Sequence, residues 1–302
     1  MRILLIAPGA IGAYFGGKLA LAGASVAIAG RNCDDLCRDG FEIRSIAGDF
    51  QWRPAQWEGS ADWILIAGKF LPDADYRPYA VPYIDAHTRV LLIQNGIGVE
   101  DRWLERFPDT PLYSAVAYIG ASRTARNRVE HTGSGYLIFG RHCGAPEPEA
   151  AELAELWHSA GIRADLTGEI QSYRWKKLLW NVPYNVVSVL SRSDTRRMMD
   201  GGSLEAVCLA MMEETAAVAA ACGFPQAPEI LQETAAYTRD FPAYKTSMLL
   251  DFEAARPMEI EGILGNVVRL AQHHQVPVPH LSMAYALLTA LSEKNGKIAG
   301  KI

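Results

Sequence analysis

The amino-acid sequence predicts an α/β protein with two domains, the first built on a parallel sheet and the second all-helical. Three observations lead to this prediction. Residues 2–29 read as a strand, a glycine-containing turn, a helix and a second strand, which is the unit that builds parallel sheets. Strand-like runs continue to residue 166, and only helical patterns follow residue 169. At 302 residues the chain is also too long for one typical core, so we expect domains at 1–167 and 168–302.

The expected elements follow the chain in a simple order. Strands are predicted at residues 2–6, 25–29, 41–46, 50–53, 63–67, 89–93, 112–118, 128–131, 136–140 and 163–166, with helices at 13–23 and 147–160. Helices are then predicted at residues 170–191, 203–222, 226–238, 247–274 and 280–294. Pro183 and Pro257 lie inside two of these patterns, so we expect a kink or a break at each.

The composition is that of a soluble globular protein, with 49% hydrophobic and 21% charged residues. A formal net charge of −5 provides no basic field for nucleic acid. No apolar run is long enough to span a membrane, and the first residues resemble a strand rather than a signal peptide. The five scattered cysteines fit a reducing cytoplasm, and neither they nor the seven histidines have the spacing of metal ligands. We therefore expect a cytoplasmic protein without nucleic-acid, membrane or metal partners.

The turn after the first strand carries a degenerate form of the glycine pattern of Rossmann-type dinucleotide-binding domains. Gly9 would let the backbone approach a pyrophosphate, and Gly12 would let the helix pack closely on the strand. The N-terminus of the helix supplies N–H donors and partial positive charge for phosphates. Ala7 replaces the first glycine, which mainly serves the tight turn. The alternative is a tight turn without a ligand. The expected dinucleotide-binding residues of the turn are Gly9, Ala10, Ile11 and Gly12.

The residue after the second strand favours NADP(H) over NAD. Sites for NAD usually carry Asp or Glu there to bind the ribose 2′-hydroxyl, whereas the guanidinium of Arg31 suits a 2′-phosphate. In the alternative, Arg31 faces solvent and Asp34 or Asp35 binds the ribose. Lys69 and Asn95 follow two later strands, at the edge where open α/β sheets bind their ligands.

The most informative helix of the C-terminal half covers residues 172–191. Its apolar residues form one wide stripe, and Lys177, Asn181 and Asn185 form a row on the other side, four residues apart. No charged residue follows Lys177 until Arg192. We therefore expect a helix buried on both sides, with its amides facing something polar. The alternative is a surface lysine at the start of a helix, followed by two asparagines that satisfy neighbouring backbone groups.

A second polar group is expected at residues 247–265. Glu259 opens a helix after Pro257, and Gly262 and Gly265 continue the same face. A glycine inside a helix costs about 1 kcal/mol relative to alanine, so two of them need a reason, and close helix packing is the simplest one. The carboxylate of Glu259 could equally serve only to stabilise the helix N-terminus.

Together these residues resemble the ketopantoate reductase, or 2-dehydropantoate 2-reductase, family from end to end. The most specific part is a lysine followed by asparagines four and eight residues later, then Ser-Met and Glu-Ile-Glu. The resemblance is carried by Gly9-Ala10-Ile11-Gly12, Arg31, Lys69, Asn95-Gly96-Ile97-Gly98, Trp175-Lys176-Lys177-Leu178, Asn181, Asn185, Ser247-Met248, Asp251, Arg256 and Glu259-Ile260-Glu261.

This resemblance implies that NADPH reduces a 2-keto acid, most simply 2-dehydropantoate (ketopantoate) to pantoate in pantothenate synthesis. It makes Lys177 the general acid that protonates the carbonyl oxygen, and Glu259 the residue that binds the substrate hydroxyl. Burial should lower the pKa of Lys177, and Glu259 should oppose that shift. With the cofactor on the first domain and the acid on the second, we expect the chemistry in the cleft between them. The resemblance further assigns substrate contacts to Asn95, Asn181, Asn185 and Ser247, and cofactor contacts to Arg31, Lys69 and Asn95.

Three positions depart from the family pattern. Besides Ala7 in the glycine turn, Thr195 and Tyr244 stand where the family carries asparagines that touch the substrate end. These departures leave the redox chemistry intact but weaken the case for ketopantoate, so a paralogue acting on a bulkier or more apolar 2-keto acid is an alternative. A non-catalytic NADP(H)-binding regulator is another, although it would not need both Lys177 and Glu259. The sequence leaves the oligomeric state open, a homodimer included.

Overall fold

The computed structural model describes residues 1–31 and 33–299, and the chain divides into two compact units. The first unit comprises Met1–Lys69, Asp73–Gln94 and Val99–Ile170. The second comprises the chain from Gln171 onward together with two short segments of the N-terminal half, Phe70–Pro72 and Asn95–Gly98. Residues far apart in the sequence therefore meet within the second unit.

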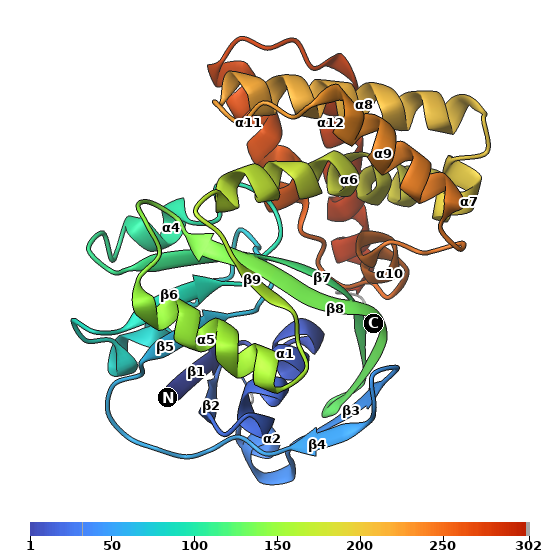
Figure 1. Ribbon diagram of the computed structural model, residues 1–302. Coiled ribbons are helices and arrows are strands. Elements are labelled where there is room, and N and C mark those ends of the chain that lie inside the picture. Colours follow the sequence, from blue (N-terminus) through green and yellow to red (C-terminus); the bar gives the residue numbers. More distant parts are fainter. Residues whose placement is uncertain (32, 300–302) are drawn as a thin grey trace. The chain divides into compact units, whose positions relative to one another are not determined.

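The first unit is built on one mixed sheet, which confirms the predicted α/β class (Figure 1). Its strands are β1 (Arg2–Ile6), β2 (Ser25–Ala29), β3 (Phe41–Ser45), β4 (Phe50–Trp52), β5 (Trp63–Ile66), β6 (Arg89–Leu92), β7 (Leu112–Ala125), β8 (Arg128–Arg141) and β9 (Ala164–Leu166). The order is β2-β1-β5-β6-β7-β8-β3-β4, with β9 beside β8. The five strands from β2 to β7 are mutually parallel, whereas β7 with β8 and β3 with β4 pair antiparallel.

The parallel strands are apolar on both sides because both faces of the sheet are covered. Residues 3–6 of β1 are fully buried, and every residue of β5 is buried. Helices α1 (Ala10–Leu21) and α5 (Pro148–Ser159) contribute to the same core. The indole of Trp157 on α5 donates to the carbonyl of Phe15 on α1 at 3.2 Å, which holds the two helices together.

The strands β7 and β8 are longer than the sequence predicts. The expected strands at 128–131 and 136–140 are one strand, and β7 continues well beyond residue 118. The polar segment between the two expected strands reads as a turn, but it stays paired with β7 through shifts of register. Ser134 and Gly135 take positive φ there, and such irregularities let a strand continue through turn-like residues.

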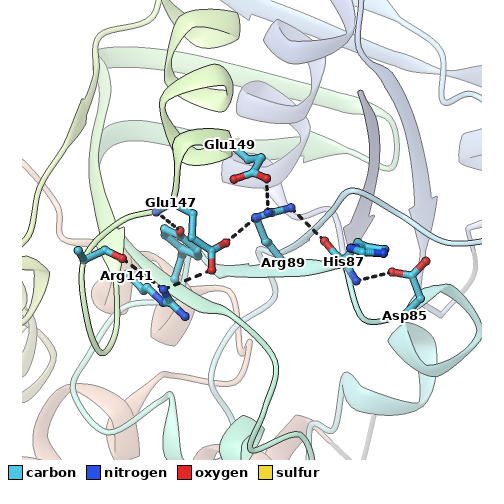
Figure 2. A network of polar contacts seen from close by, with 8 residues as sticks. Asp85, His87, Arg89, Arg141, Glu147 and Glu149 are labelled. Carbon is cyan, nitrogen blue, oxygen red and sulfur yellow. Dashed lines mark hydrogen bonds and ion pairs between the residues drawn. The ribbon is translucent and has the colours of Figure 1, made fainter.

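An ionic network joins the start of β6 to the start of α5 (Figure 2). Arg89 binds Glu147 at 2.7 Å and Glu149 at 2.6 Å, and it also donates to the carbonyl of His87. Arg141 reaches the second oxygen of Glu147 at 3.2 Å. The arginine side chain of residue 89 is only 15% exposed, so these contacts are better shielded from solvent than most surface ion pairs.

The second unit is helical. Its elements are α6 (Ile170–Ser191), α7 (Thr195–Met198), α8 (Ser203–Ala221), α9 (Pro228–Asp240), α10 (Ser247–Glu253), a π-helix (Glu261–Gly265), α11 (Asn266–His273) and α12 (Pro279–Ala299). In the part of the chain that the structure describes, none of the helices has the length and apolarity that a membrane span requires.

Helix α6 forms the centre of this unit. Residues 181–189 are all buried, which confirms the prediction of a helix buried on both sides. Of the kink or break expected at Pro183, the break is wrong: α6 runs through the proline as one helix, packed in an apolar core. The break expected near Pro257 is confirmed, since a non-helical stretch separates α10 from the π-helix.

The turn between β1 and α1 contains a residue in a costly backbone conformation. Ala7 has a φ of +52°, in the left-handed region that favours glycine. Its N–H donates to the carbonyl of Ala29 at 2.8 Å, so the turn is tied to the end of β2 in this conformation. An alanine at the first glycine position therefore keeps the turn at a cost in stability.

Replacing this alanine should stabilise the protein. We expect Ala7→Gly to raise the free energy of unfolding by about 1 kcal/mol, because it removes the left-handed penalty on a residue with a β-carbon. Urea denaturation measures the change. Ala217→Gly, in the exposed middle of α8, is the matched control and should lower the free energy of unfolding by about 1 kcal/mol. Losses of equal size in both variants would contradict the strain at residue 7.

Candidate functional site

In the first unit, the two glycines of the β1–α1 turn have different surroundings. A β-carbon on Gly9 would meet only the carbonyl oxygen of Ala67, at 3.8 Å. A β-carbon on Gly12 would lie 2.7 Å from the β-carbon of Ala67 and 3.3 Å from Leu5. Gly12 is therefore required by the packing of α1 on the sheet, whereas Gly9 leaves open backbone at the start of α1. Open backbone at a helix N-terminus fits the phosphates of a dinucleotide.

The other expected cofactor residues lie at the same edge of the sheet. β2, β1 and β5 are parallel neighbours, so their carboxyl ends meet where the glycine turn, Arg31 and Lys69 follow them. A β-carbon on Gly30 would lie 3.4 Å from the Cα atom of Ala7. The backbone therefore passes close to the glycine turn at residue 30, and Arg31 is the next residue. Arg31 is exposed and Lys69 is half-buried.

The acidic alternative at this edge is partly engaged elsewhere. Asp35 binds Arg38 at 2.8 Å and forms a second ion pair with Arg126. A carboxylate held by two arginines is a poorer acceptor for a further hydroxyl group than a free one. Asp34 begins α2 (Asp34–Asp39) and is exposed.

In the second unit, the amide of Asn95 lies between a cation and a carboxylate. The ammonium of Lys177 donates to Asn95 Oδ1 at 2.9 Å. Asn95 Nδ2 donates to Glu259 Oε2 at a longer 3.4 Å, and the N–H of Phe70 donates to Glu259 Oε1 at 3.0 Å. Three residues that the sequence analysis named from separate segments are thus brought together.

The ammonium of Lys177 has a perturbed proton affinity. The pKa of Lys177 is lowered to about 8, chiefly by burial and also by the positive charge of Arg174, while the carboxylate of Glu259 opposes the shift. The direction and the opposing effect of the carboxylate are those that the sequence predicts. A lysine with this pKa is mostly protonated at neutral pH and can also release its proton.

Two glycines bring the Asn95 segment and the π-helix into contact. Gly96 has a φ of +102°, and a β-carbon there would lie 2.2 Å from the carbonyl oxygen of Gly262. The N–H of Ile97 donates to that same carbonyl at 3.0 Å, and Asn266 Nδ2 donates to the carbonyl of Ile97 at 2.6 Å. The helix packing expected for Gly262 is wrong in its partner, because the glycine lies against this segment and not against a second helix.

The remaining polar residues of α6 and α10 have separate roles. Asn181 is 6% exposed, and its side chain forms no hydrogen bond with any residue that the structure describes. Asn185 is 1% exposed and accepts from the N–H of Met248 at 3.3 Å and from Ser247 Oγ at 3.5 Å. Asn185 thus satisfies the start of α10, as the structural alternative expected. Ser247 is exposed at the first position of that helix.

Thr195 and Tyr244, two of the departures from the family pattern, form one hydrogen-bonded pair. The N–H of Thr195 donates to the carbonyl of Tyr244 at 3.0 Å, and the N–H of Tyr244 donates to Thr195 Oγ1 at 3.0 Å. The ring of Tyr244 lies 6.5 Å from that of Trp180 and 6.1 Å from that of Phe241. The replacements are therefore bonded to each other, and the tyrosine ring packs in an aromatic cluster with Trp180 on α6 and Phe241.

Two contributors to the site escaped the sequence analysis. Arg174 is 2% exposed and its Nη1 donates to the carbonyl of Gly96 at 2.8 Å. Its signal was available, since it lies three residues before Lys177 on the same face of α6. The backbone N–H of Phe70 has no sequence signal at all.

Within residues 1–31 and 33–299, no group of three or more His, Cys, Asp or Glu side chains could hold a metal ion.

Comparisons with known proteins agree along the whole chain. The family model described as Ketopantoate reductase PanE/ApbA matches residues 3–144, and its C-terminal counterpart matches residues 169–292. The structure of 2-dehydropantoate 2-reductase from Methylococcus capsulatus is 36% identical, with a TM-score of 0.92 and 98% of each chain covered. The enzyme of the same name from Geobacter metallireducens is 26% identical, with a TM-score of 0.88 and coverage of 97% of this chain and 99% of that one. A 2-dehydropantoate 2-reductase from Nostoc sp. is 26% identical over 97% of this chain and 96% of its own length. The chain belongs to the ketopantoate reductase family.

Proposed function

We propose that this protein is an NADPH-dependent reductase that converts 2-dehydropantoate (ketopantoate) to pantoate. The observation that carries the proposal is the half-buried ammonium of Lys177, held by the Asn95 amide beside the carboxylate of Glu259. This arrangement provides a proton and a stabilising charge for the carbonyl oxygen of a 2-keto acid. The relatives named above carry this activity in their names.

The residues of this chain supply the proton side of the reaction. When bound, the nicotinamide supplies the hydride for the carbonyl carbon. Negative charge then builds on the carbonyl oxygen, where the Lys177 ammonium stabilises it and transfers a proton. With a pKa of about 8, Lys177 holds that proton at neutral pH and gives it up more readily than an ordinary lysine. Asn95 keeps the ammonium oriented between transfers.

The carboxylate of Glu259 serves the substrate and the lysine together. Its two oxygens accept from the Phe70 N–H and the Asn95 amide, and a carboxylate oxygen is also the kind of acceptor that binds a substrate hydroxyl. Its charge also favours the protonated form of Lys177. Asn181 lies one turn after Lys177 on the same face of α6, which supports a role as a substrate ligand. Asn185 acts by holding Ser247.

NADP(H) is the proposed cofactor rather than NAD(H). Arg31 supports this choice because it follows β2 next to the glycine turn, where a 2′-phosphate would lie. Lys69 follows β5, which pairs with β1 on the side opposite β2, and would add a second positive charge. We also propose a cytoplasmic location, which the five free cysteines support.

A second candidate is a reductase of a bulkier or more apolar 2-keto acid. The bonded pair of Thr195 and Tyr244 favours it, because the tyrosine ring joins Trp180 and Phe241 where the family pattern has amides. An aromatic side chain contributes apolar contact area, while an amide offers hydrogen bonds to a hydroxylated substrate.

A panel of 2-keto acids tests the proposed activity. We expect NADPH oxidation, followed by the loss of its near-ultraviolet absorbance, with the highest kcat/KM for ketopantoate. A branched or aromatic 2-keto acid that is preferred about tenfold would favour the second candidate, since one pocket contact is worth that much. If NADPH binds but no 2-keto acid is reduced, a regulatory role replaces the enzymatic one.

Lys177→Met should lower kcat by roughly 100-fold or more, because it removes the proton donor. The affinity for NADPH, measured by fluorescence titration, should stay unchanged. Lys176→Met is the matched control, since this neighbour is exposed, and it should retain nearly full activity. Near-normal turnover in Lys177→Met would refute the assigned proton donor.

Two variants of the first unit separate phosphate binding from cofactor choice. Gly9→Ala should weaken the binding of NADPH and of NADH alike, because its β-carbon occupies the space where a pyrophosphate would approach the backbone. Its free energy of unfolding should equal that of the wild type. Arg31→Gln should weaken the binding of NADPH roughly tenfold and leave the affinity for NADH unchanged, since it removes a charge-assisted hydrogen bond to the 2′-phosphate. Both dissociation constants come from fluorescence titration, with Arg38→Gln on α2 as the control. Equal losses for the two nucleotides in Arg31→Gln would count against NADP(H) selection by this residue.

A further inference from the structure

Arg174 is a buried cation in the first turns of α6. The whole residue is 2% exposed, which is rare for an arginine because burying its charge is costly. A buried charge of this kind is expected to make a hydrogen bond that serves the structure or the site. Its Nη1 donates to the carbonyl oxygen of Gly96 at 2.8 Å.

The carbonyl that Arg174 holds is that of Gly96, the residue directly after Asn95. Asn95 is the residue whose amide accepts from Lys177 and donates to Glu259. Gly96 has no side chain and a φ of +102°, so contacts from other segments must hold its carbonyl group in place. Arg174 therefore anchors the segment from the side of α6, while the π-helix holds it through the Gly262 carbonyl.

Arg174 also acts on Lys177 through its charge. The two residues are three positions apart, so their side chains lie on the same face of α6. The charged groups that act on the lysine are Arg174 on α6 and Glu259 before the π-helix. The arginine lowers the pKa of Lys177 and the carboxylate raises it. Removing the arginine charge would therefore raise the pKa.

We propose that Arg174 is a positioning residue of the reduction, which fixes the Asn95 segment so that its amide is held against Lys177. This inference rests on the proposed function, since it concerns the same proton donor. Arg174 acts through Asn95 and Lys177 and is assigned no contact with the substrate.

Two substitutions at residue 174 separate its hydrogen bond from its charge. Arg174→Met removes both, so kcat should fall about tenfold, as expected for a displaced catalytic group. The loss of activity at alkaline pH should move about one pH unit higher, because the pKa of Lys177 rises when its cationic neighbour is removed. Arg174→Lys keeps the charge but not the planar fork, so kcat should fall several-fold while the alkaline limb stays in place.

The affinity for NADPH and the exposed Lys176→Met variant serve as controls, and neither should differ from the wild type. If Arg174→Met keeps kcat within twofold and its alkaline limb does not move, the proposal is overturned. A fall in kcat that only tracks loss of folded protein or of NADPH binding, with the limb unmoved, also overturns it.

A measurement without substrate separates this proposal from the proposed function. Trace acetylation of Lys177 by acetic anhydride, followed by mass spectrometry across the pH range, reports the titration of the lysine itself. The titration should lie higher in Arg174→Met than in the wild type, and superimposable curves would overturn the coupling. A shifted curve in a protein that reduces no 2-keto acid would refute the reductase and retain the coupling of the two residues.

Discussion

The amide of Asn95 holds the ammonium of Lys177 with its oxygen and faces the carboxylate of Glu259 with its nitrogen. A buried ammonium without partners costs several kcal/mol, and the usual outcome is a loss of its proton. Here the amide and the carboxylate offset part of that cost, and the pKa of Lys177 is about 8. The site can therefore keep a proton at neutral pH and still transfer it.

Much of the irregular backbone of the second unit follows from placing this amide. The Asn95 segment lies in the N-terminal half of the sequence but packs within the helical unit. Gly96 and Gly262 come so close there that a β-carbon on Gly96 would overlap the backbone of Gly262. The helix after Glu259 widens into a π-helix where that contact is made. Such bulges concentrate at functional sites because they re-aim backbone groups without ending a helix. Arg174 completes the support from α6.

The sequence predicted the elements best where one physical signal dominated. The parallel strands and α6 followed from apolar runs and helical spacing, whereas β8 was split in two because its polar middle reads as a turn. Pro183 failed to break α6 because burial outweighs one lost hydrogen bond. In the site, Lys177 and Glu259 were named from pattern and resemblance. The backbone of Phe70 was not, since an N–H belongs to every residue and only the folded chain selects it.

Chemical rescue tests the central claim most directly. In Lys177→Ala, a small alkylammonium ion such as ethylammonium could enter the space of the missing side chain and donate the proton. The account predicts that NADPH-dependent reduction returns in a saturable way with added ethylammonium, and that it responds to the pKa of the amine used. Tetramethylammonium, which has no proton to give, should restore nothing. Equal stimulation by both ions, or by neither while substrate and NADPH still bind, would contradict a proton delivered from the ammonium of residue 177.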